Sequence, residues 1–82
     1  MFTIGEFSKI NKISTRMLRH YDKIGLLKPA QIDKWTGYRY YSIQQIEELK
    51  KILTLKYLNF SLKTIKKMKE NNYKNVDNFI KE

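Results

Sequence analysis

Residues 14–23 read STRMLRHYDK, and this stretch determines how the rest of the chain is interpreted. If it winds as an α-helix, its basic side chains recur every three or four residues and form one stripe along the helix. The members of this stripe are Arg16, Arg19, His20 and Lys23. Leu18 and Tyr21 fall on the opposite side, where they can pack inward. A short helix with one basic and one apolar face suits the major groove of DNA, so the stretch indicates a nucleic-acid partner.

The residues on either side of this stretch predict a helix-turn-helix. Thr3 and Glu6 have the spacing of a capping box, which predicts that a first short helix begins after Thr3. The chain then turns at Asn11-Lys12, where Asn11 tolerates a left-handed backbone conformation, and Ser14 caps the basic helix. Gly25 suits the left-handed position that ends this second helix. A helix, a turn of three or four residues and a second helix together define the motif.

The middle of the chain predicts a β-hairpin. Pro29 prevents any further helix because it pushes Lys28 towards an extended conformation. Residues 30–32 and 38–41 flank a turn that contains Gly37, and the second segment, YRYY, has the aromatic content and alternation of a strand. Two strands alone are unstable, so this hairpin must lean on the helices or on a partner.

Two more helices are expected after the hairpin. Ser42 and Gln45 have the spacing of a second capping box, and Ser61 caps the last helix after a left-handed break at Asn59. The residues predicted to face inward from this pair are Ile46, Leu49, Leu53 and Tyr57, followed by Leu62, Ile65 and Met68. The fold class is therefore mainly α: a winged helix-turn-helix with a short β-hairpin wing, followed by a helix pair.

Composition restricts the possible functions. The chain has 82 residues and a formal charge of +9, with 17 Lys and Arg against 8 Asp and Glu. This excess favours a polyanion or an anionic membrane surface as partner. Residues 49–69 carry seven lysines and no acidic residue, which suggests one face for the polyanion, although a solvated helix surface has the same composition. The absence of cysteine removes disulfides and thiolate metal sites and fits a cytoplasmic location.

Neither a signal peptide nor a stretch of about 20 apolar residues, the length needed to span a membrane, is visible in the sequence. A module on a membrane surface is disfavoured because the Leu, Ile and Met positions are needed for the core. An enzyme is disfavoured because no paired carboxylates, phosphate-binding Gly loop or nucleophile–base pair can be found, and we expect no catalytic residue. His20 is the only histidine, so neither a metal site nor a cofactor is expected.

Four separated motifs resemble those of the MerR family of transcriptional regulators. They are TIGEF at 3–7, S-x-R-x-LRHYDKIGLLKP at 14–29, GYRYYS at 37–42 and LNFSL at 58–62. The resemblance covers about residues 2–70. It implies a winged helix-turn-helix DNA-binding domain at 1–72 and the start of a dimerisation helix at 73–82.

The resemblance also implies how the protein works. Double-stranded promoter DNA is the expected partner, bound by a homodimer of a longer protein that acts on RNA polymerase indirectly, by distorting the promoter spacer. A small architectural DNA binder is the alternative, since such proteins share the winged helix-turn-helix, and the helix that begins at Val76 looks unfinished for that reading.

The resemblance assigns DNA-binding roles on three segments. Thr15 and Arg16 are candidates for base edges, because arginine can pair bidentately with guanine, whereas Arg19 is expected to clamp a phosphate. Ser61 is a helix cap first and a phosphate contact second. The complete set is Thr15, Arg16, Arg19, His20, Tyr21, Lys23, Tyr38, Arg39, Tyr40, Lys56, Ser61 and Lys66.

Some aromatic residues also have a purely structural interpretation. Tyr21 can pack its ring inward and still offer its hydroxyl to a phosphate. Alternation places Tyr38 and Tyr40 on one face of the hairpin, and at least one of them is expected to pack against Leu26-Leu27. Trp35 is not part of the family pattern, and packing on the hairpin or contact with another domain is favoured over insertion into DNA.

Overall fold

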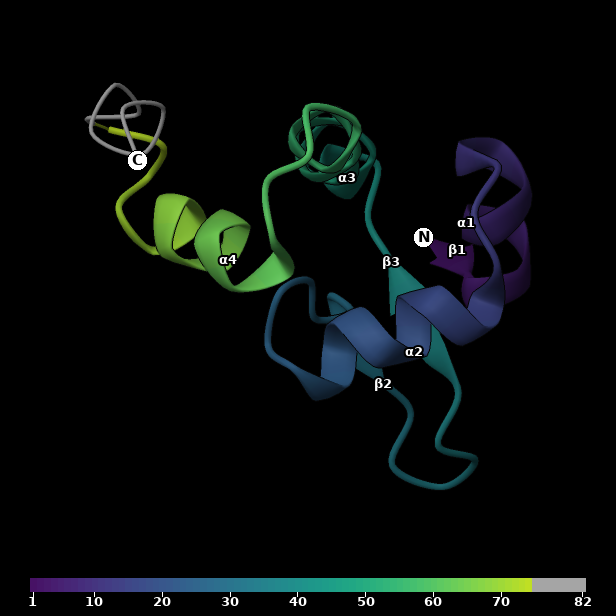
Figure 1. Cartoon of the computed structure of the whole chain (residues 1–82). Coiled ribbons are helices and arrows are strands. Elements are labelled where there is room, and N and C mark those ends of the chain that lie inside the picture. The colour runs from purple at the N-terminus through teal and green to yellow at the C-terminus, as the bar shows by residue number, and fades with distance from the viewer. Residues whose placement is uncertain (75–82) are drawn as a thin grey trace.

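The part of the chain that the computed structural model describes, residues 1–74, consists of four helices and a small sheet (Figure 1). The helices are α1 (Ile4–Asn11), α2 (Thr15–Lys23), α3 (Gln44–Tyr57) and α4 (Leu62–Glu70). The strands are β1 (Phe2–Thr3), β2 (Gln31–Ile32) and β3 (Arg39–Tyr41). This order confirms the mainly helical winged helix-turn-helix that the sequence predicts. Of the dimerisation helix expected at 73–82, residues 75–82 lie outside the described part.

β3 is the central strand of an antiparallel sheet with the order β1-β3-β2. Ile32 pairs with Arg39 in the expected hairpin, and Phe2 pairs with Tyr41 on the other edge of β3. The expected two-stranded hairpin is therefore incomplete, because β1 adds a third strand. A strand of two residues shows no alternation in the sequence, so only its pairing reveals it. Through β1, which leads directly into α1, the hairpin gains the support that two isolated strands lack.

The predicted caps of α1 and α2 are present. Thr3 Oγ1 accepts a hydrogen bond from the Glu6 amide at 3.2 Å, and Glu6 Oε1 accepts one from the Thr3 amide at 2.8 Å, which completes the capping box. Ser14 Oγ accepts from the Met17 amide at 3.0 Å where α2 begins. Gly25 has the predicted left-handed conformation after α2, with φ of 74°.

The turn between α1 and α2 differs from the prediction by one residue. The left-handed residue is Lys12, with φ of 53°, and Asn11 is the last residue of α1. Asn11 Nδ2 donates to the Phe7 carbonyl oxygen at 2.8 Å. This bond stabilises a helical backbone at Asn11, so the expectation that Asn11 itself takes the left-handed position is wrong.

The core decides which face of α2 remains outside. Its buried residues come from all four helices, from β3 and from the segment after α2; they are Phe7, Leu18, Tyr21, Leu26, Leu27, Tyr41, Leu49, Ile52 and Ile65. The rings of Phe7 and Tyr41 are stacked, with centroids 4.5 Å apart. Leu18 and Tyr21 are 0% and 1% exposed, as predicted. Burying a side chain of this size stabilises the fold by about 1.5–3 kcal/mol, so these two residues fix the rotation of α2.

The start of α3 shows half of the second capping box. The Ser42 amide donates to Gln45 Oε1 at 2.9 Å, but no side chain caps the first turn, and α3 begins at Gln44. Gln45 Nε2 instead donates to the Lys28 carbonyl oxygen, at 2.6 Å. This contact ties the start of α3 to the segment that follows α2.

The inward face of the α3–α4 pair differs from the prediction at Tyr57. This side chain is 85% exposed, while Leu49 and Ile52 are fully buried. The inward face of α3 is centred on Leu49 and Ile52. It is therefore rotated by roughly a quarter of a helical turn from the predicted stripe, in the direction that leaves Tyr57 in solvent. The other end of the pair is as predicted, since Asn59 is left-handed, with φ of 69°, and Ser61 Oγ caps α4.

Candidate nucleic-acid interface

The basic stripe of α2 faces outward. All of its members are exposed, as is Thr15 at the start of the helix; the members are Arg16, Arg19, His20 and Lys23. In residues 1–74, no ion pair ties down Arg16 or Arg19. Both guanidinium groups are therefore available to a phosphate or a base edge, with five N–H donors each. The two faces predicted for α2 are therefore confirmed, and contact of the basic face with a DNA groove stays a prediction.

Tyr21 belongs to the core rather than to this outer face. Its side chain is 1% exposed, and burial raises the pKa of its hydroxyl. The structural interpretation accounts for the ring. A contact between the Tyr21 hydroxyl and a phosphate stays a prediction.

An ion pair connects the wing to α2. Arg39 Nε donates to Asp22 Oδ2 at 2.9 Å, and Lys28 Nζ lies 3.6 Å from Asp22 Oδ1. The Asp22 and Arg39 side chains are 13% and 30% exposed, so the pair is partly shielded from water. This role of Asp22 is absent from the sequence prediction. A signal existed, because Asp22 is the one acidic residue in the basic helix.

A hollow of about 470 Å³ is lined by the hairpin, by the junction of β1 and α1 and by Arg19 of α2. Its lining brings together residues predicted from two separate motifs, and it consists of Thr3, Ile4, Arg19, Thr36, Gly37, Tyr38 and Arg39. Two arginines and an exposed tyrosine beside one concave surface suit a phosphodiester group. Of the two wing tyrosines, Tyr38 is 64% exposed and Tyr40 is half-buried. Trp35, in the turn between β2 and β3, is 96% exposed, so the expectation that its ring packs on the hairpin is wrong.

The charges of this region also act on a buried hydroxyl. Tyr41 Oη has no hydrogen-bond partner among the described residues, although its side chain is fully buried. Burial raises the pKa of Tyr41, and the nearby Asp22 carboxylate raises it further, while Arg39 and Arg19 act in the opposite direction. Tyr41 therefore stays neutral and contributes through its stacked ring.

The segment around α4 contains the remaining candidates. Lys56 and Ser61 are exposed, and the Ser61 hydroxyl both accepts from the Thr64 amide at 3.1 Å and donates to Thr64 Oγ1 at 2.9 Å. Lys66 Nζ would lie 3.4 Å from a Cβ atom placed on Gly25. The ammonium of Lys66 is thus next to the end of α2, close to the basic stripe.

Not every lysine of residues 49–69 is free for a polyanion. Lys69 Nζ donates to the Leu26 carbonyl oxygen and lies 3.2 Å from Glu48 Oε1. Its side chain is 26% exposed. Lys69 therefore connects α4 with α3 and with the segment after α2. This structural role could not be predicted from the sequence, where Lys69 is one of several neighbouring lysines.

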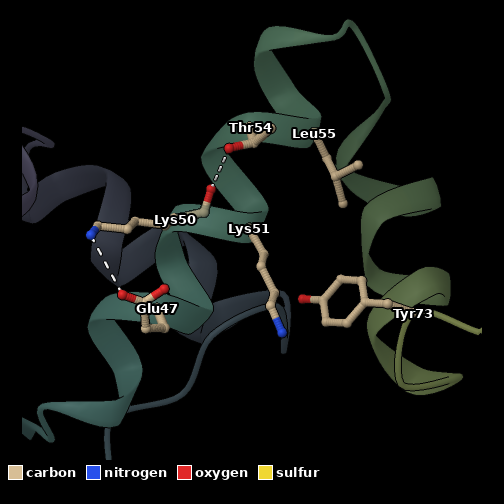
Figure 2. Close-up of a pocket in the computed structure, with 6 residues that line it drawn as sticks. All are labelled: Glu47, Lys50, Lys51, Thr54, Leu55 and Tyr73. Atoms are coloured by element: carbon tan, nitrogen blue, oxygen red, sulfur yellow. Dashed lines mark hydrogen bonds and ion pairs between the residues drawn. The ribbon is translucent and has the colours of Figure 1, made fainter.

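A second hollow, of about 330 Å³, lies beside α3 and contains none of the predicted DNA-binding residues. Figure 2 shows its lining: Glu47, Lys50, Lys51, Thr54, Leu55 and Tyr73. Lys50 Nζ is 3.5 Å from Glu47 Oε1, and Lys51 Nζ lies 5.2 Å from the centroid of the Tyr73 ring. Both ammonium groups thus have partners within the domain. None of the lining residues belongs to α2, so this hollow is separate from the basic face of that helix.

The exposed basic face of α2, the hairpin attached beside it and the helix pair behind it define a winged helix-turn-helix of the nucleic-acid-binding class. The chain belongs to the MerR HTH family of regulatory proteins, whose family model matches residues 2–72. No helix within residues 1–74 has both the length and the apolar character for crossing a bilayer.

Several curated relatives are named as transcriptional regulators. The chain is 49% identical over 69 residues to the transcriptional regulator BrlR of Pseudomonas aeruginosa and 45% identical over 69 residues to the multidrug-efflux transporter 1 regulator of Bacillus subtilis. Each match covers 84% of this chain but only 26% and 25% of the relative, respectively. The chain therefore spans about a quarter of the length of these relatives.

Solved structures share the fold. The cryo-EM structure of an EcmrR–DNA complex has a TM-score of 0.83 and 37% identity, over 85% of this chain and 26% of that chain. The crystal structure of MtaN, the N-terminal part of a Bacillus subtilis multidrug transporter activator, has a TM-score of 0.77 and 38% identity, over 83% of this chain and 63% of that chain. These likenesses confirm the winged helix-turn-helix at the level of three-dimensional structure.

Proposed function

We propose that this chain binds double-stranded promoter DNA and forms the DNA-binding part of a MerR-type transcriptional regulator. The observation that carries the proposal is α2, whose guanidinium groups point outward while Leu18 and Tyr21 anchor its other side in the core. The fold is also that of EcmrR, whose solved structure contains DNA. A formal charge of +9 favours the same partner through release of counterions.

On α2, Thr15 and Arg16 read base edges in the major groove, and Arg19 holds a phosphate beside the wing. His20 and Lys23 continue the same exposed stripe and add contacts to the backbone. Because α2 is anchored by its apolar side, these contacts require no rearrangement of the helix.

The wing contributes Tyr38, Arg39 and Tyr40. Arg39 uses Nε for Asp22, which leaves the two terminal nitrogens of its guanidinium for a phosphate. The ion pair therefore occupies one donor of Arg39 and leaves the rest of its guanidinium for contact with the DNA backbone. Lys56, Ser61 and Lys66 extend the contact around α4, where the lysines supply attraction that is independent of DNA sequence.

Residues 1–72 form the DNA-binding domain in this proposal, and a homodimer of a longer protein presents two such domains to one promoter. Its action on RNA polymerase is indirect, through distortion of the promoter spacer. Such a protein works in the cytoplasm and has no catalytic step, and it requires neither a cofactor nor a metal.

Binding measured by fluorescence anisotropy tests this function. The probes are a labelled duplex selected from a random pool for tightest binding and the same duplex with a scrambled sequence. Arg16→Ala is expected to weaken binding to the selected duplex about tenfold more than binding to the scrambled one, because bidentate guanine pairing carries base discrimination.

Lys50→Ala is the matched control, since it also removes one exposed positive charge and its partner Glu47 is on the same helix. It is expected to weaken binding to both duplexes equally and only slightly. Equal losses on both duplexes with Arg16→Ala would contradict base reading by Arg16. Failure of the unmodified chain to bind any duplex at low ionic strength would refute the proposed function.

A further inference from the structure

The hollow beside α3 has an apolar interior and takes no part in the proposed contact with DNA (Figure 2). Its volume of about 330 Å³ lies at the lower end of the range for sites that hold small organic molecules. Leu55 and the ring of Tyr73 contribute its largest apolar groups. Thr54 Oγ1 donates to the Lys50 carbonyl oxygen at 2.8 Å, which leaves the methyl group of Thr54 for the hollow. The interior thus suits a small molecule with an apolar body.

The charged side chains of the hollow do not balance one another. Figure 2 shows Glu47 and Lys50 pointing towards each other on the side of α3 away from Tyr73, and Lys50 Nζ lies 3.5 Å from Glu47 Oε1. Lys51 forms no ion pair within residues 1–74. Its ammonium lies 5.2 Å from the centroid of the Tyr73 ring, and a ring face is a weak partner for an exposed cation. The hollow therefore carries one surplus positive charge, on the side of Tyr73.

Tyr73 adds a second donor that lacks an acceptor. Its Oη atom is buried and forms no hydrogen bond with any residue of the described part. Burial raises the pKa of this hydroxyl, and the Glu48 carboxylate raises it further, so the hydroxyl stays protonated and can donate. Glu48 itself is paired with Lys69, at 3.2 Å. Because a buried hydroxyl without a partner is unfavourable, a group that accepts from Tyr73 is stabilised here.

The two donors lie on the same side of the hollow. Figure 2 shows the Tyr73 hydroxyl directed at the Lys51 side chain. Lys51 is exposed, and exposed side chains change rotamer within nanoseconds, so rotation of Lys51 gives a bound molecule access to both donors. A carboxylate accepts hydrogen bonds on each of its two oxygens, and its charge matches the ammonium. The chemistry of this side of the hollow is therefore that of a carboxylate site.

We propose that this hollow binds a small aromatic carboxylate, whose ring lies against Leu55 and Tyr73 and whose carboxylate accepts from Lys51 and the Tyr73 hydroxyl. An aromatic ring gains an offset-stacked contact with Tyr73 that an aliphatic chain lacks. The surplus positive charge selects the anion over a neutral or cationic molecule with the same ring. The proposal does not rest on the proposed function, because no lining residue belongs to the predicted DNA-binding set.

Such a ligand joins α3 to the segment that follows α4. Lys51 and Leu55 belong to α3, whereas Tyr73 comes shortly after Glu70, the last residue of α4. A molecule that binds the folded domain and not the unfolded chain raises the stability of the fold. Binding in the hollow therefore reinforces the helix pair behind α2 and leaves the basic face of α2 untouched.

Three probes that share one ring system and differ in charge test the proposal: naphthoate, naphthalenemethanol and naphthylmethylammonium. Each is titrated into the isotope-labelled 82-residue chain, and the NMR shifts of the backbone amides give the Kd and locate the site. Naphthoate is expected to bind with a Kd of about 0.1–1 mM, as suits a small ligand in an open site, and to shift the amides of residues 47–55 and 73. The neutral alcohol is expected to bind about tenfold more weakly, and the ammonium more weakly still, because Lys51 repels it.

Variants separate the two donors. Lys51→Gln is expected to weaken naphthoate binding about tenfold and to leave the alcohol unaffected, because it removes only the charged contact. Lys63→Gln is the matched control, since Lys63 is also an exposed lysine but does not line the hollow.

Tyr73→Phe removes the hydroxyl alone. It is expected to weaken naphthoate binding severalfold without lowering the stability of the free domain in urea, because the hydroxyl has no partner among the described residues. A hydroxyl with a purely structural role would give the reverse, a loss of stability with unchanged affinity for naphthoate, and would contradict the proposal.

Other results overturn the proposal in distinct ways. Equal affinity for the three probes would remove the role of Lys51, and preference for the ammonium would assign the hollow to cations held by Glu47. No amide shift at ten times the expected Kd would remove the site altogether. Shifts of the amides of residues 47–55 that depend on protein concentration alone would assign the hollow to a second copy of the chain. A chain that binds naphthoate but no duplex retains this site and refutes only the proposed function.

Discussion

Neutralising Asp22 is expected to lower the stability of the domain and, at the same time, to raise its affinity for DNA. In Asp22→Asn, the side chain keeps its shape and one acceptor oxygen but loses the charge that holds Arg39 at 2.9 Å and Lys28 at 3.6 Å. A hydrogen bond to a charged group contributes about 1.5–3 kcal/mol, and an exposed ion pair about 0–1 kcal/mol. The Asp22 and Arg39 side chains are 13% and 30% exposed, so we expect a loss of about 1 kcal/mol.

Urea and thermal unfolding measure this loss. For a domain of this size, about 1 kcal/mol lowers the melting temperature by roughly 4–8 °C. The double-mutant cycle with Arg39→Gln isolates the pair, and a coupling energy of about 1 kcal/mol is expected, since residues in contact are not additive. Additivity of the two substitutions, within about 0.3 kcal/mol, would refute the claim that this pair holds the wing against α2.

The effect on DNA binding has the opposite sign. Asp22→Asn raises the net charge by one and releases the whole guanidinium of Arg39 to the phosphates. Affinity for random duplex is therefore expected to rise, and the slope of log affinity against log salt to steepen by about 0.9 per added phosphate contact. A variant that is less stable and also binds more weakly at every salt concentration would contradict this role of Arg39.

Further substitutions test other parts of the structure. Lys66→Gln should weaken binding to all duplexes alike and flatten the salt slope by about one, because its ammonium supplies only backbone attraction; an unchanged slope removes it from the interface. Lys69→Met should lower the free energy of unfolding by about 1–3 kcal/mol through loss of its carbonyl hydrogen bond and ion pair, whereas the exposed Lys67→Met should change it by less than about 0.5 kcal/mol in the same urea titration. The pKa of Glu6 is lowered by hydrogen bonds from Thr3, so the capping box stabilises the fold above the pKa of Glu6 in the unfolded chain and loses this contribution as pH falls through the lowered value. Glu6→Gln should remove that part of the acid sensitivity, and an unchanged dependence of unfolding on pH would show that the box does not contribute.

Short-range features of this chain were predictable from the sequence. Caps at Thr3, Ser14 and Ser61 depend on partners three residues away, and the left-handed turn at Gly25 depends on one residue. The two faces of α2 follow from helical periodicity alone. The family motifs extended this local information to the order of the whole fold.

Contacts between distant residues were not predictable in the same way. Arg39 reaches Asp22 across 17 residues, and Lys69 reaches the Leu26 carbonyl across 43. From the sequence alone, Lys69 in its run of lysines and Arg39 in its short strand would both be expected to point into solvent. Their partners become evident only when the chain is folded.

The sequence by itself determined that a two-faced basic helix exists, that it follows a short capped helix, and that a hairpin and a helix pair come after it. Tertiary structure decided how these parts are joined: β1 supports the hairpin, Asp22 anchors the wing, Tyr57 points into solvent, and Trp35 stands exposed at the tip. The physical reason is distance along the chain. Helix periodicity and caps act within a few residues, whereas burial and ion pairing depend on which surfaces the whole fold brings together.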